Sequence, residues 1–271
     1  MYILQVITKI GRQKRNQERY NIYLNEEYAF AVDEGTLIKF ELQKGKVLEQ
    51  MEIDEIQYED EIAKAFNKAL NFLSYQMRSE HEVKQKLVQA GHGEAVVQEA
   101  IHKLNRLGFL NDESYSKALL ETRKRTAKKG PAAIRQDLMK KGIAKDLQQE
   151  VLKSFGQDEQ MQLAMELAEK AIRANDNKTP TQVKQKIQDV LLRKGYSYSI
   201  VSDVLEQVSL ERKEDEWNTL IENQGEKVWR KYTSKFEGFE LHQKVKQALY
   251  QKGFPKEIIS EFIEQKEQQD E

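Results

Sequence analysis

The chain contains no cysteine and only three prolines among its 271 residues. Without cysteine it can form neither a disulfide nor a thiolate zinc site. It also lacks an apolar stretch of the roughly 18 to 20 residues that a membrane span requires. The first residues do not show the basic segment, apolar run and small-residue cleavage site of a signal peptide. We therefore expect a cytoplasmic protein that has no contact with a membrane.

Charges of one sign are missing from particular segments, although the net charge is only −1. From Val47 to Ile62 there are seven acids and no base. From Ser114 to Lys145 there are ten bases against two acids, a local balance of +8. Because the electrostatic field depends on local charge, this basic segment predicts contact with a polyanion or with an acidic protein surface.

Motifs that carry chemistry are missing as well. The four histidines do not show the His-x-x-x-His spacing of a helical zinc site. There is no glycine-rich phosphate loop ending in Lys-Ser or Lys-Thr, and no serine lies in a nucleophile elbow. We therefore expect a protein that is not an enzyme and that holds no cofactor and no metal.

What the chain does contain is a repeat. An aliphatic residue, a leucine and a glycine follow one another at four-residue steps in four copies: Val83/Leu87/Gly91, Ile134/Leu138/Gly142, Ile187/Leu191/Gly195 and Val245/Leu249/Gly253. The glycines are 51, 53 and 58 residues apart. Such a period predicts a repeat array that buries apolar faces between neighbouring units and offers a long concave surface to an elongated partner.

Each repeat reads as three helices. In the first, the apolar spacing predicts helices over 62–75, 79–90 and 96–107, the second of them opened by a capping box of Ser79 and Glu82. The glycine suits the left-handed residue that ends a helix. Prolines 131, 180 and 255 fall where helices of the later repeats should begin, a position that tolerates proline. The repeat leucines Leu87, Leu138, Leu191 and Leu249 are then core residues.

The N-terminal segment has a different period. Apolar residues alternate with polar ones over 20–24 and 28–32, and again over 37–42 and 47–53 on either side of a Lys-Gly-Lys turn. This pattern predicts β-hairpins, with Ile3–Thr8 as a further strand. Helix is expected from about Glu59 onward.

The predicted fold is therefore mostly α, with tandem three-helix repeats forming an elongated curved array behind a small antiparallel β unit. We divide the chain into the β unit, residues 1–58, and four repeats, residues 59–110, 111–156, 157–209 and 210–271.

Basic residues of the second repeat are the candidate binding site for nucleic acid or protein. They are Arg123, Lys124, Arg125, Lys128, Lys129, Arg135, Lys140 and Lys141. An ordinary structural explanation competes with this one, because cations stabilise helix C-termini and lysine-rich helix faces are common solvated surface. The concentration of the surplus in one repeat of four favours binding. Of the conspicuous aromatic residues, Tyr196, Trp217 and Trp229 are expected to pack rather than to stack on bases.

Three runs of residues resemble the RecX family of recombination regulators. They are RSEHEVKQKL at 78–87, LGFLNDESY at 107–115, and KGPAAIRQDL followed by KKGI at 129–143. The resemblance covers about residues 62–208 and is looser in the third repeat, where LLRKGY at 191–196 is its clearest part. The N-terminal β segment and the fourth repeat appear as additions to the shorter form of the family.

The resemblance implies a regulator that lies along the groove of the RecA filament on single-stranded DNA. We expect the chain to be a monomer. It implies inhibition of the recombinase, ATPase and SOS coprotease activities of RecA. Two alternatives remain open: a nucleic-acid-binding module that acts without RecA, since three short helices resemble helix-turn-helix packing, and a helical-repeat protein scaffold whose basic face is incidental.

Overall fold

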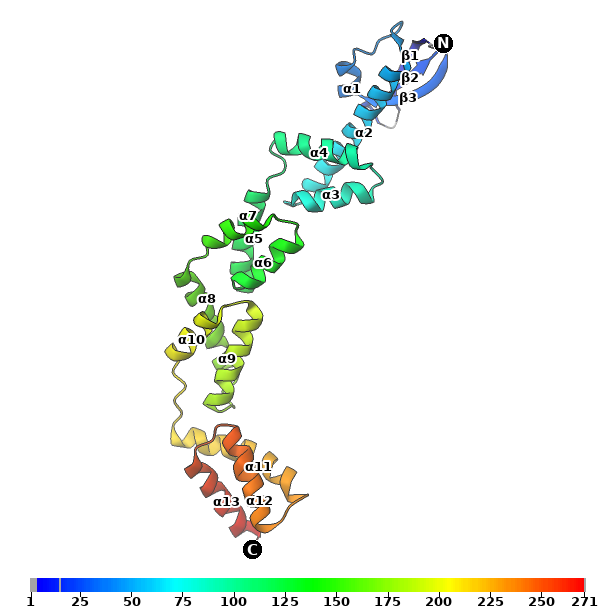
Figure 1. The fold of residues 1–271 in the computed structure, drawn as a ribbon. Helices are drawn as coiled ribbons and strands as arrows, with labels where there is room; N and C mark the ends of the chain where they lie inside the picture. Colours follow the sequence, from blue (N-terminus) through cyan, green and yellow to red (C-terminus); the bar gives the residue numbers. More distant parts are fainter. Residues whose placement is uncertain (1–3, 15, 271) are drawn as a thin grey trace. The chain divides into compact units, whose positions relative to one another are not determined.

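The computed structural model describes residues 4–14 and 16–270, which form a small β-sheet followed by helices (Figure 1). The chain divides into two compact units. The first comprises the chain up to Ala118 together with Leu138–Gln148, and the second comprises the remainder. Residues of the second repeat therefore contribute to both units.

The N-terminal sheet is antiparallel, with strand order β3-β2-β1-β4. Its strands are β1 (Gln5–Arg12), β2 (Arg19–Leu24), β3 (Glu27–Asp33) and β4 (Val47–Leu48). The predicted hairpin between β2 and β3 is confirmed. Its turn residues Asn25 and Glu26 have φ of 49° and 73°, the conformation of a two-residue turn that matches the twist of the strands. The first strand begins at Gln5 among the described residues, and Ile3 lies outside them.

The predicted strands over 37–42 and 47–53 are wrong. Helix α1 (Glu34–Lys39) replaces the first, because the Asp33 carboxylate caps it by accepting a hydrogen bond of 2.7 Å from the backbone N–H of Thr36. The second is reduced to β4, because Glu49 and Glu52 form a capping box that opens helix α2 (Gln50–Leu73). Apolar residues of this segment still enter the core of the N-terminal unit, among them Leu42, Leu48 and Ile53.

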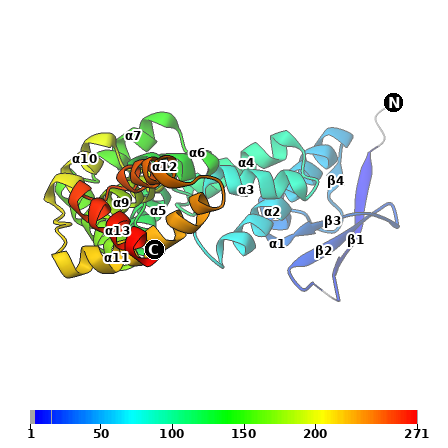
Figure 2. The ribbon, with the colours of Figure 1, turned by 90° about the horizontal axis from the view of Figure 1, so that it is seen from below.

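Helix α2 also begins well before Glu59. Its first half buries Ile53 and Ile56 against the sheet, and its second half contributes Ile62, Ala65 and Ala69 to the core of the first repeat (Figure 2). The predicted boundary between residues 58 and 59 therefore falls inside one continuous helix. The division into five parts stays a prediction.

Three-helix repeats make up the rest of the fold, and the predicted fold class is confirmed in this respect. The first repeat consists of α2, α3 (Glu80–Gln89) and α4 (Glu94–Arg106). The second consists of α5 (Asp112–Ala127), α6 (Pro131–Lys140) and α7 (Lys145–Lys153). The third consists of α8 (Gln157–Arg173), α9 (Pro180–Lys194) and α10 (Tyr198–Gln207). The fourth consists of α11 (Glu214–Thr233), α12 (Gly238–Gln251) and α13 (Lys256–Asp270).

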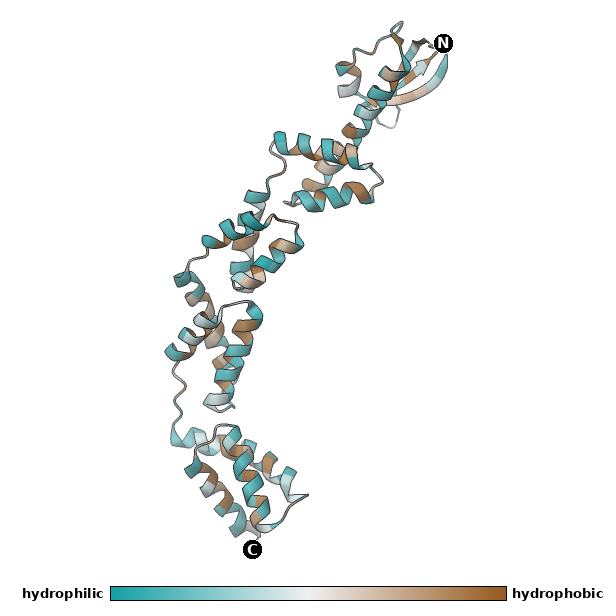
Figure 3. Ribbon diagram, viewed as in Figure 1, coloured by the Kyte–Doolittle hydropathy of each residue, from teal (hydrophilic) through white to brown (hydrophobic). Residues whose placement is uncertain are grey.

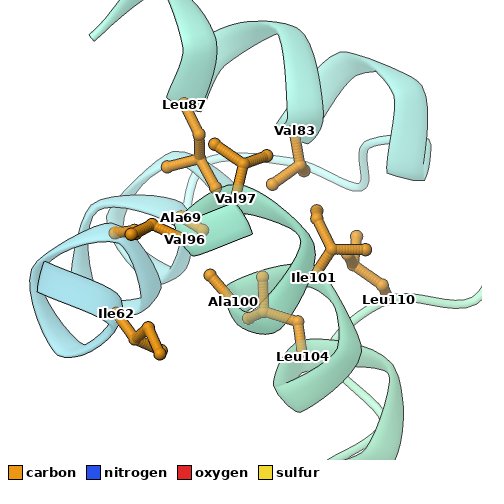
Figure 4. Packing of buried hydrophobic residues seen from close by; sticks show 11 residues of the cluster. Ile62, Ala69, Val83, Leu87, Val96, Val97, Ala100, Ile101, Leu104 and Leu110 are labelled. Atoms are coloured by element: carbon orange, nitrogen blue, oxygen red, sulfur yellow. The ribbon is translucent and has the colours of Figure 1, made fainter. Parts of the chain in front are cut away.

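The helices are amphipathic, with hydrophobic and hydrophilic residues alternating along each ribbon (Figure 3). In the first repeat, side chains from α2, α3 and α4 converge on one core that contains Val83, Leu87 and Leu104 (Figure 4). The four repeat leucines, Leu87, Leu138, Leu191 and Leu249, are each 0% exposed. Their prediction as core residues is confirmed, and each contributes roughly 1.5 to 3 kcal/mol by its burial.

The helix starts and ends follow the sequence signals. Ser79 and Glu82 form the predicted capping box, while Pro131 and Pro180 are the first residues of α6 and α9. Pro255 lies one residue before α13, and its carbonyl accepts the first helical hydrogen bond, from Ile259. Gly195 ends α9 with φ of 88°, as a left-handed helix cap should.

One contact recurs between consecutive repeats. The glycine turn that ends the second helix of one repeat lies against the start of the second helix of the repeat before it. A Cβ on Gly142 would come 2.3 Å from the Cβ of His81, one on Gly195 would come 2.4 Å from the backbone N of Ala133, and one on Gly253 would come 2.3 Å from Thr181 Oγ1. Gly91 of the first repeat has nothing within 4 Å. Glycine at these turns therefore serves the packing of one repeat on another as well as the turn itself.

Candidate interaction surface in the second repeat

Seven of the eight basic residues singled out in the sequence lie around the C-terminal ends of α5 and α6, and Arg135 lies in the middle of α6. Arg123, Lys124 and Arg125 are in the last two turns of α5, and Lys128 and Lys129 are in the connection to α6. Arg135 and Lys140 are on α6, and Lys141 follows its last residue. Cations at these positions are favoured by the unpaired carbonyls of a helix C-terminus. The structure separates the eight into residues that carboxylates neutralise and residues that remain unpaired.

Lys124 is a buried cation. Its side chain is 8% exposed, and its ammonium lies 2.7 Å from Glu121 Oε1 and 2.7 Å from Glu159 Oε1. The ammonium also lies 5.1 Å from the centre of the Phe155 ring. Burial alone would lower the pKa of Lys124, but the hydrogen bonds to Glu121 and Glu159 outweigh it, and the pKa is raised above 10.5. Lys124 is therefore charged and held within the protein.

Asp137 on α6 holds two of the basic residues. Its Oδ2 lies 2.7 Å from the Lys129 ammonium and 2.8 Å from Arg123 Nε. Burial would raise the pKa of Asp137, but the hydrogen bond and charge of Lys129, with the charge of Arg123, lower it below 3.8. This cluster fixes the connection between α5 and α6.

Lys128 forms an ion pair with Glu166 on α8. Its φ is 48°, so the chain turns sharply at this residue. The turn is fixed from the third repeat, because the Tyr196 hydroxyl donates a hydrogen bond of 3.1 Å to the Lys128 carbonyl and the Lys194 ammonium donates one of 2.7 Å to the Ala127 carbonyl. Burial raises the pKa of Tyr196 to about 12, so its hydroxyl remains protonated and able to donate.

Lys141 is paired within the first compact unit. Its ammonium lies 2.6 Å from Glu82 Oε1, and Glu82 Oε2 accepts a hydrogen bond of 3.1 Å from the Tyr115 hydroxyl. Although burial would raise the pKa of Glu82, the hydrogen bond from Lys141 and that from the Ser79 backbone lower it. The same glutamate completes the capping box of α3, so this pair stabilises a helix start.

Arg125, Arg135 and Lys140 are different. Their side chains are exposed, and no carboxylate among the described residues lies within 4.0 Å of their charged groups. We call these three residues the unpaired bases. A binding partner could reach each of them without breaking an ion pair.

Counting charges along the sequence could not make this distinction. The partners Glu159 and Glu166 come from the third repeat and Glu82 from the first, all outside the basic segment 114–145. The segment therefore presents far less free positive charge than its balance of +8 suggests. We did not predict a separate group of lysines between the third and fourth repeats, because its members are scattered among acids in the sequence.

The other sequence expectations concern aromatic residues and metals. Tyr196 and Trp229 are buried and Trp217 packs against the core of the fourth repeat, which confirms that all three are packing residues. Within residues 4–14 and 16–270, histidine and carboxylate side chains form no group of three or more that could hold a metal. None of the described helices offers an apolar run long enough to cross a membrane.

Comparison with known sequences gives matches along almost the whole chain. The family described as regulatory protein RecX N-terminal domain matches residues 5–49. The RecX first and second three-helix domains match residues 65–104 and 111–152. The RecX third three-helix domain matches twice, at 158–205 and 214–263. The resemblance therefore extends beyond residues 62–208 to the β segment and the fourth repeat, and the predicted limit of the resemblance to 62–208 is wrong.

Individual proteins agree with the family matches. Regulatory protein RecX of Bacillus subtilis (strain 168) is 41% identical over 262 residues, which cover 96% of this chain and 98% of the relative. A crystal structure of regulatory protein RecX is 37% identical and superimposes with a TM-score of 0.67, covering 75% of this chain and 100% of its own. RecX from Lactobacillus salivarius, also known from a crystal structure, is 34% identical with a TM-score of 0.53 and covers 55% of this chain and 99% of its own.

Proposed function

Because this chain belongs to the RecX family of regulatory proteins, we propose that it inhibits RecA by binding along the RecA filament on single-stranded DNA. In this role it lowers the ATPase, recombinase and SOS coprotease activities of RecA and acts in the cytoplasm as a monomer. It works by binding and not by chemistry of its own. The proposal joins the family membership to one structural observation.

That observation is the set of unpaired bases. Arg125, Arg135 and Lys140 are exposed on α5 and α6, and no carboxylate in the described part of the chain forms an ion pair with them. An exposed cation without a partner keeps its full charge for an anionic ligand. When it meets a phosphate, it displaces a counterion condensed on the nucleic acid, and this release drives binding. An acidic protein surface would be attracted by the same charges.

The paired residues have a different part in the proposal. Lys124 and Lys128 connect α5 and the turn after it to carboxylates of α8, and Lys129 connects that turn to Asp137. These pairs hold the backbone that carries Arg125. We therefore assign the contact with the filament to the unpaired bases, and we assign a supporting role to Arg123, Lys124, Lys128, Lys129 and Lys141.

The test is RecA-dependent ATP hydrolysis on poly(dT), titrated with this protein. The variant is Arg125→Glu/Arg135→Glu/Lys140→Glu. Its matched control is Lys44→Glu/Lys170→Glu/Lys184→Glu, which reverses three other exposed lysines that have no ion pair among the described residues. We expect the concentration for half-inhibition to rise roughly tenfold or more in the first variant and to change little in the control.

Exposed helix residues change stability by less than about 0.5 kcal/mol, so both variants should retain the wild-type circular dichroism spectrum and urea midpoint. A folded triple variant that inhibits RecA at wild-type concentrations would contradict the assignment to the unpaired bases. Failure of the wild-type protein to affect RecA at any concentration would contradict the proposed function itself. That second result would favour the alternatives without RecA.

A further inference from the structure

A cleft of about 460 Å³ lies between the third and fourth repeats, within the second compact unit. Its walls are the turn before α9, the first turn of α9, one face of α11 and the end of α12. Four lysines line it: Lys178, Lys227, Lys231 and Lys252. We call it the lysine cleft.

Among the residues that the structure describes, no acidic residue lines the lysine cleft. Within the described part of the chain, no carboxylate lies within ion-pair distance of any of the four ammonium groups. Glu226, the neighbour of Lys227 in sequence, pairs with Lys266 on α13 and not with a lysine of the cleft. Four like charges that face one open volume repel one another, so the cleft favours an anionic occupant.

The walls of the lysine cleft are held by hydrogen bonds. The Thr179 hydroxyl donates to the Lys252 carbonyl, and Thr179 itself is 0% exposed. Gln224 Nε2 on α11 donates a hydrogen bond of 3.0 Å to the Asn177 carbonyl and lies 3.3 Å from Gln182 Oε1 on α9. The helices that carry the lysines are thus joined before any ligand arrives, which reduces the entropy lost on binding.

We propose that the lysine cleft binds the phosphodiester backbone of single-stranded nucleic acid. Lys227 and Lys231 are four residues apart on α11, which places their Cβ atoms about 5 to 6 Å apart along one face. Such a row suits a chain that presents one negative charge per nucleotide. Tyr232 also lines the cleft, and the Lys231 ammonium lies 5.3 Å from the centre of its ring. An aromatic residue at this place offers a surface on which a base could stack beside the neutralised phosphates.

The composition of the lining favours a phosphodiester over an acidic polypeptide. An aromatic residue beside lysines can stack on a base, a contact that the carboxylate side chains of an acidic polypeptide cannot make. The lining places Tyr232 beside the lysines, whose point charges tolerate many orientations of the ligand. The inference goes beyond inhibition of RecA, because the chain would bind the strand without RecA present.

The experiment measures the binding of fluorescein-labelled dT30 to the full chain by anisotropy, without RecA, between 50 and 200 mM salt. The variant is Lys227→Glu/Lys231→Glu, and the control is Lys170→Glu/Lys184→Glu, which makes the same charge change at exposed lysines outside the cleft. Each phosphate contact on a single strand contributes about −0.7 to the slope of log affinity against log salt. The cleft variant should therefore bind more weakly and flatten the slope by about 1.4, while the control should keep the wild-type slope.

Three results would overturn the proposal. The first is wild-type affinity and slope in a folded Lys227→Glu/Lys231→Glu variant. The second is an equal loss in the control variant, which would show that net charge alone sets the binding. The third is binding of a labelled poly-glutamate that the cleft variant loses while it keeps dT30 binding, which would assign the cleft to an acidic polypeptide. A neutral variant, Lys227→Gln/Lys231→Gln, keeps the test valid if charge reversal disturbs the fold.

Discussion

Two junctions between repeats can be compared, the one between the second and third repeats and the one between the third and fourth. They pack in the same way but differ in their electrostatics. At both, a glycine turn lies against the first turn of the preceding repeat's second helix, Gly195 on α6 and Gly253 on α9. At the first junction, Lys124 and Lys128 from one repeat meet Glu159 and Glu166 from the next. At the second junction, four lysines face a cleft without a carboxylate.

Lysine therefore has two different roles at these junctions, which the net charge of a sequence segment does not distinguish. Where carboxylates of the next repeat face the lysines, the charges stabilise the junction and little positive field reaches solvent. Where no carboxylate faces them, the charges add nothing to stability and remain available to a ligand. The acidic fourth repeat can therefore carry a more open cationic surface than the basic second repeat.

The largest expected effect tests the packing that the two junctions share. Gly195→Ala places a Cβ 2.4 Å from the Ala133 backbone N and also strains a residue with φ of 88°. We expect a loss of roughly 2 to 5 kcal/mol in the free energy of unfolding, from the left-handed backbone and the overpacking together. Urea denaturation followed by circular dichroism measures it.

Gly91→Ala is the matched control for that substitution. Gly91 has the same left-handed conformation, with φ of 89°, but a Cβ there would meet nothing within 4 Å. It should therefore lose only about 1 to 2 kcal/mol from backbone strain. Equal losses in the two variants would show that contact between repeats is not what requires glycine at position 195.

A smaller effect should separate the paired lysines from those of the cleft. Lys124→Met removes a charge held by Glu121 and Glu159 and keeps most of the contact with Phe155, so we expect a loss of about 1 to 3 kcal/mol. Lys231→Met removes an exposed charge without an ion pair and should change stability by less than about 0.5 kcal/mol. Chemical denaturation at low and high salt measures both, and a destabilised Lys231→Met would end the distinction between the junctions.

The smallest effect is a dependence on pH in the ion-pair cluster of Asp137 between α5 and α6. The Asp137 carboxylate has a pKa below 3.8 in the folded protein, so its stabilising contribution is complete above that value and is lost as the pH falls through the folded pKa. Asp137→Asn should be less stable than wild type by about 1 kcal/mol at pH 7, and the gap should close in strong acid. For Lys231→Gln, by contrast, the difference in stability from wild type should not shrink as the pH falls. Parallel curves of urea midpoint against pH for wild type and Asp137→Asn would disprove the role of Asp137.

Local signals made the helical part of the fold predictable. The apolar period, the Ser79 capping box and the prolines at positions 131 and 180 each act within one helical turn, so a sequence window contains the whole cause. The strands predicted between residues 37 and 53 failed because period two also arises when a short helix and a turn pack onto a sheet. There Leu37, Phe40 and Leu42 pack onto the N-terminal core from a helix and the turn after it, not from a strand.

The candidate site was less predictable because its state depends on residues from other repeats. Lys124 and Arg125 are adjacent in sequence and equally basic, yet one is a buried member of an ion-pair cluster and the other is exposed and unpaired. The lysine cleft is formed by residues from three separate segments of the chain. Only the four-residue spacing of Lys227 and Lys231 could have been recognised in the sequence. The assignment of individual bases to RecA or DNA stays a prediction.

The continuity of α2 has a consequence for how the protein is made. Asp60, in the middle of this helix, is 2% exposed and accepts hydrogen bonds from both Arg19 guanidinium NH₂ groups and from the Asp33 backbone N–H. On the ribosome, the strands emerge first. Their core lacks Ile53 and Ile56, and Arg19 lacks its partner Asp60, until residues 50–60 have also left the exit tunnel. The first cooperative folding step of the nascent chain therefore waits for a segment that also begins the first repeat, so that the sheet and the array start to form from one shared helix.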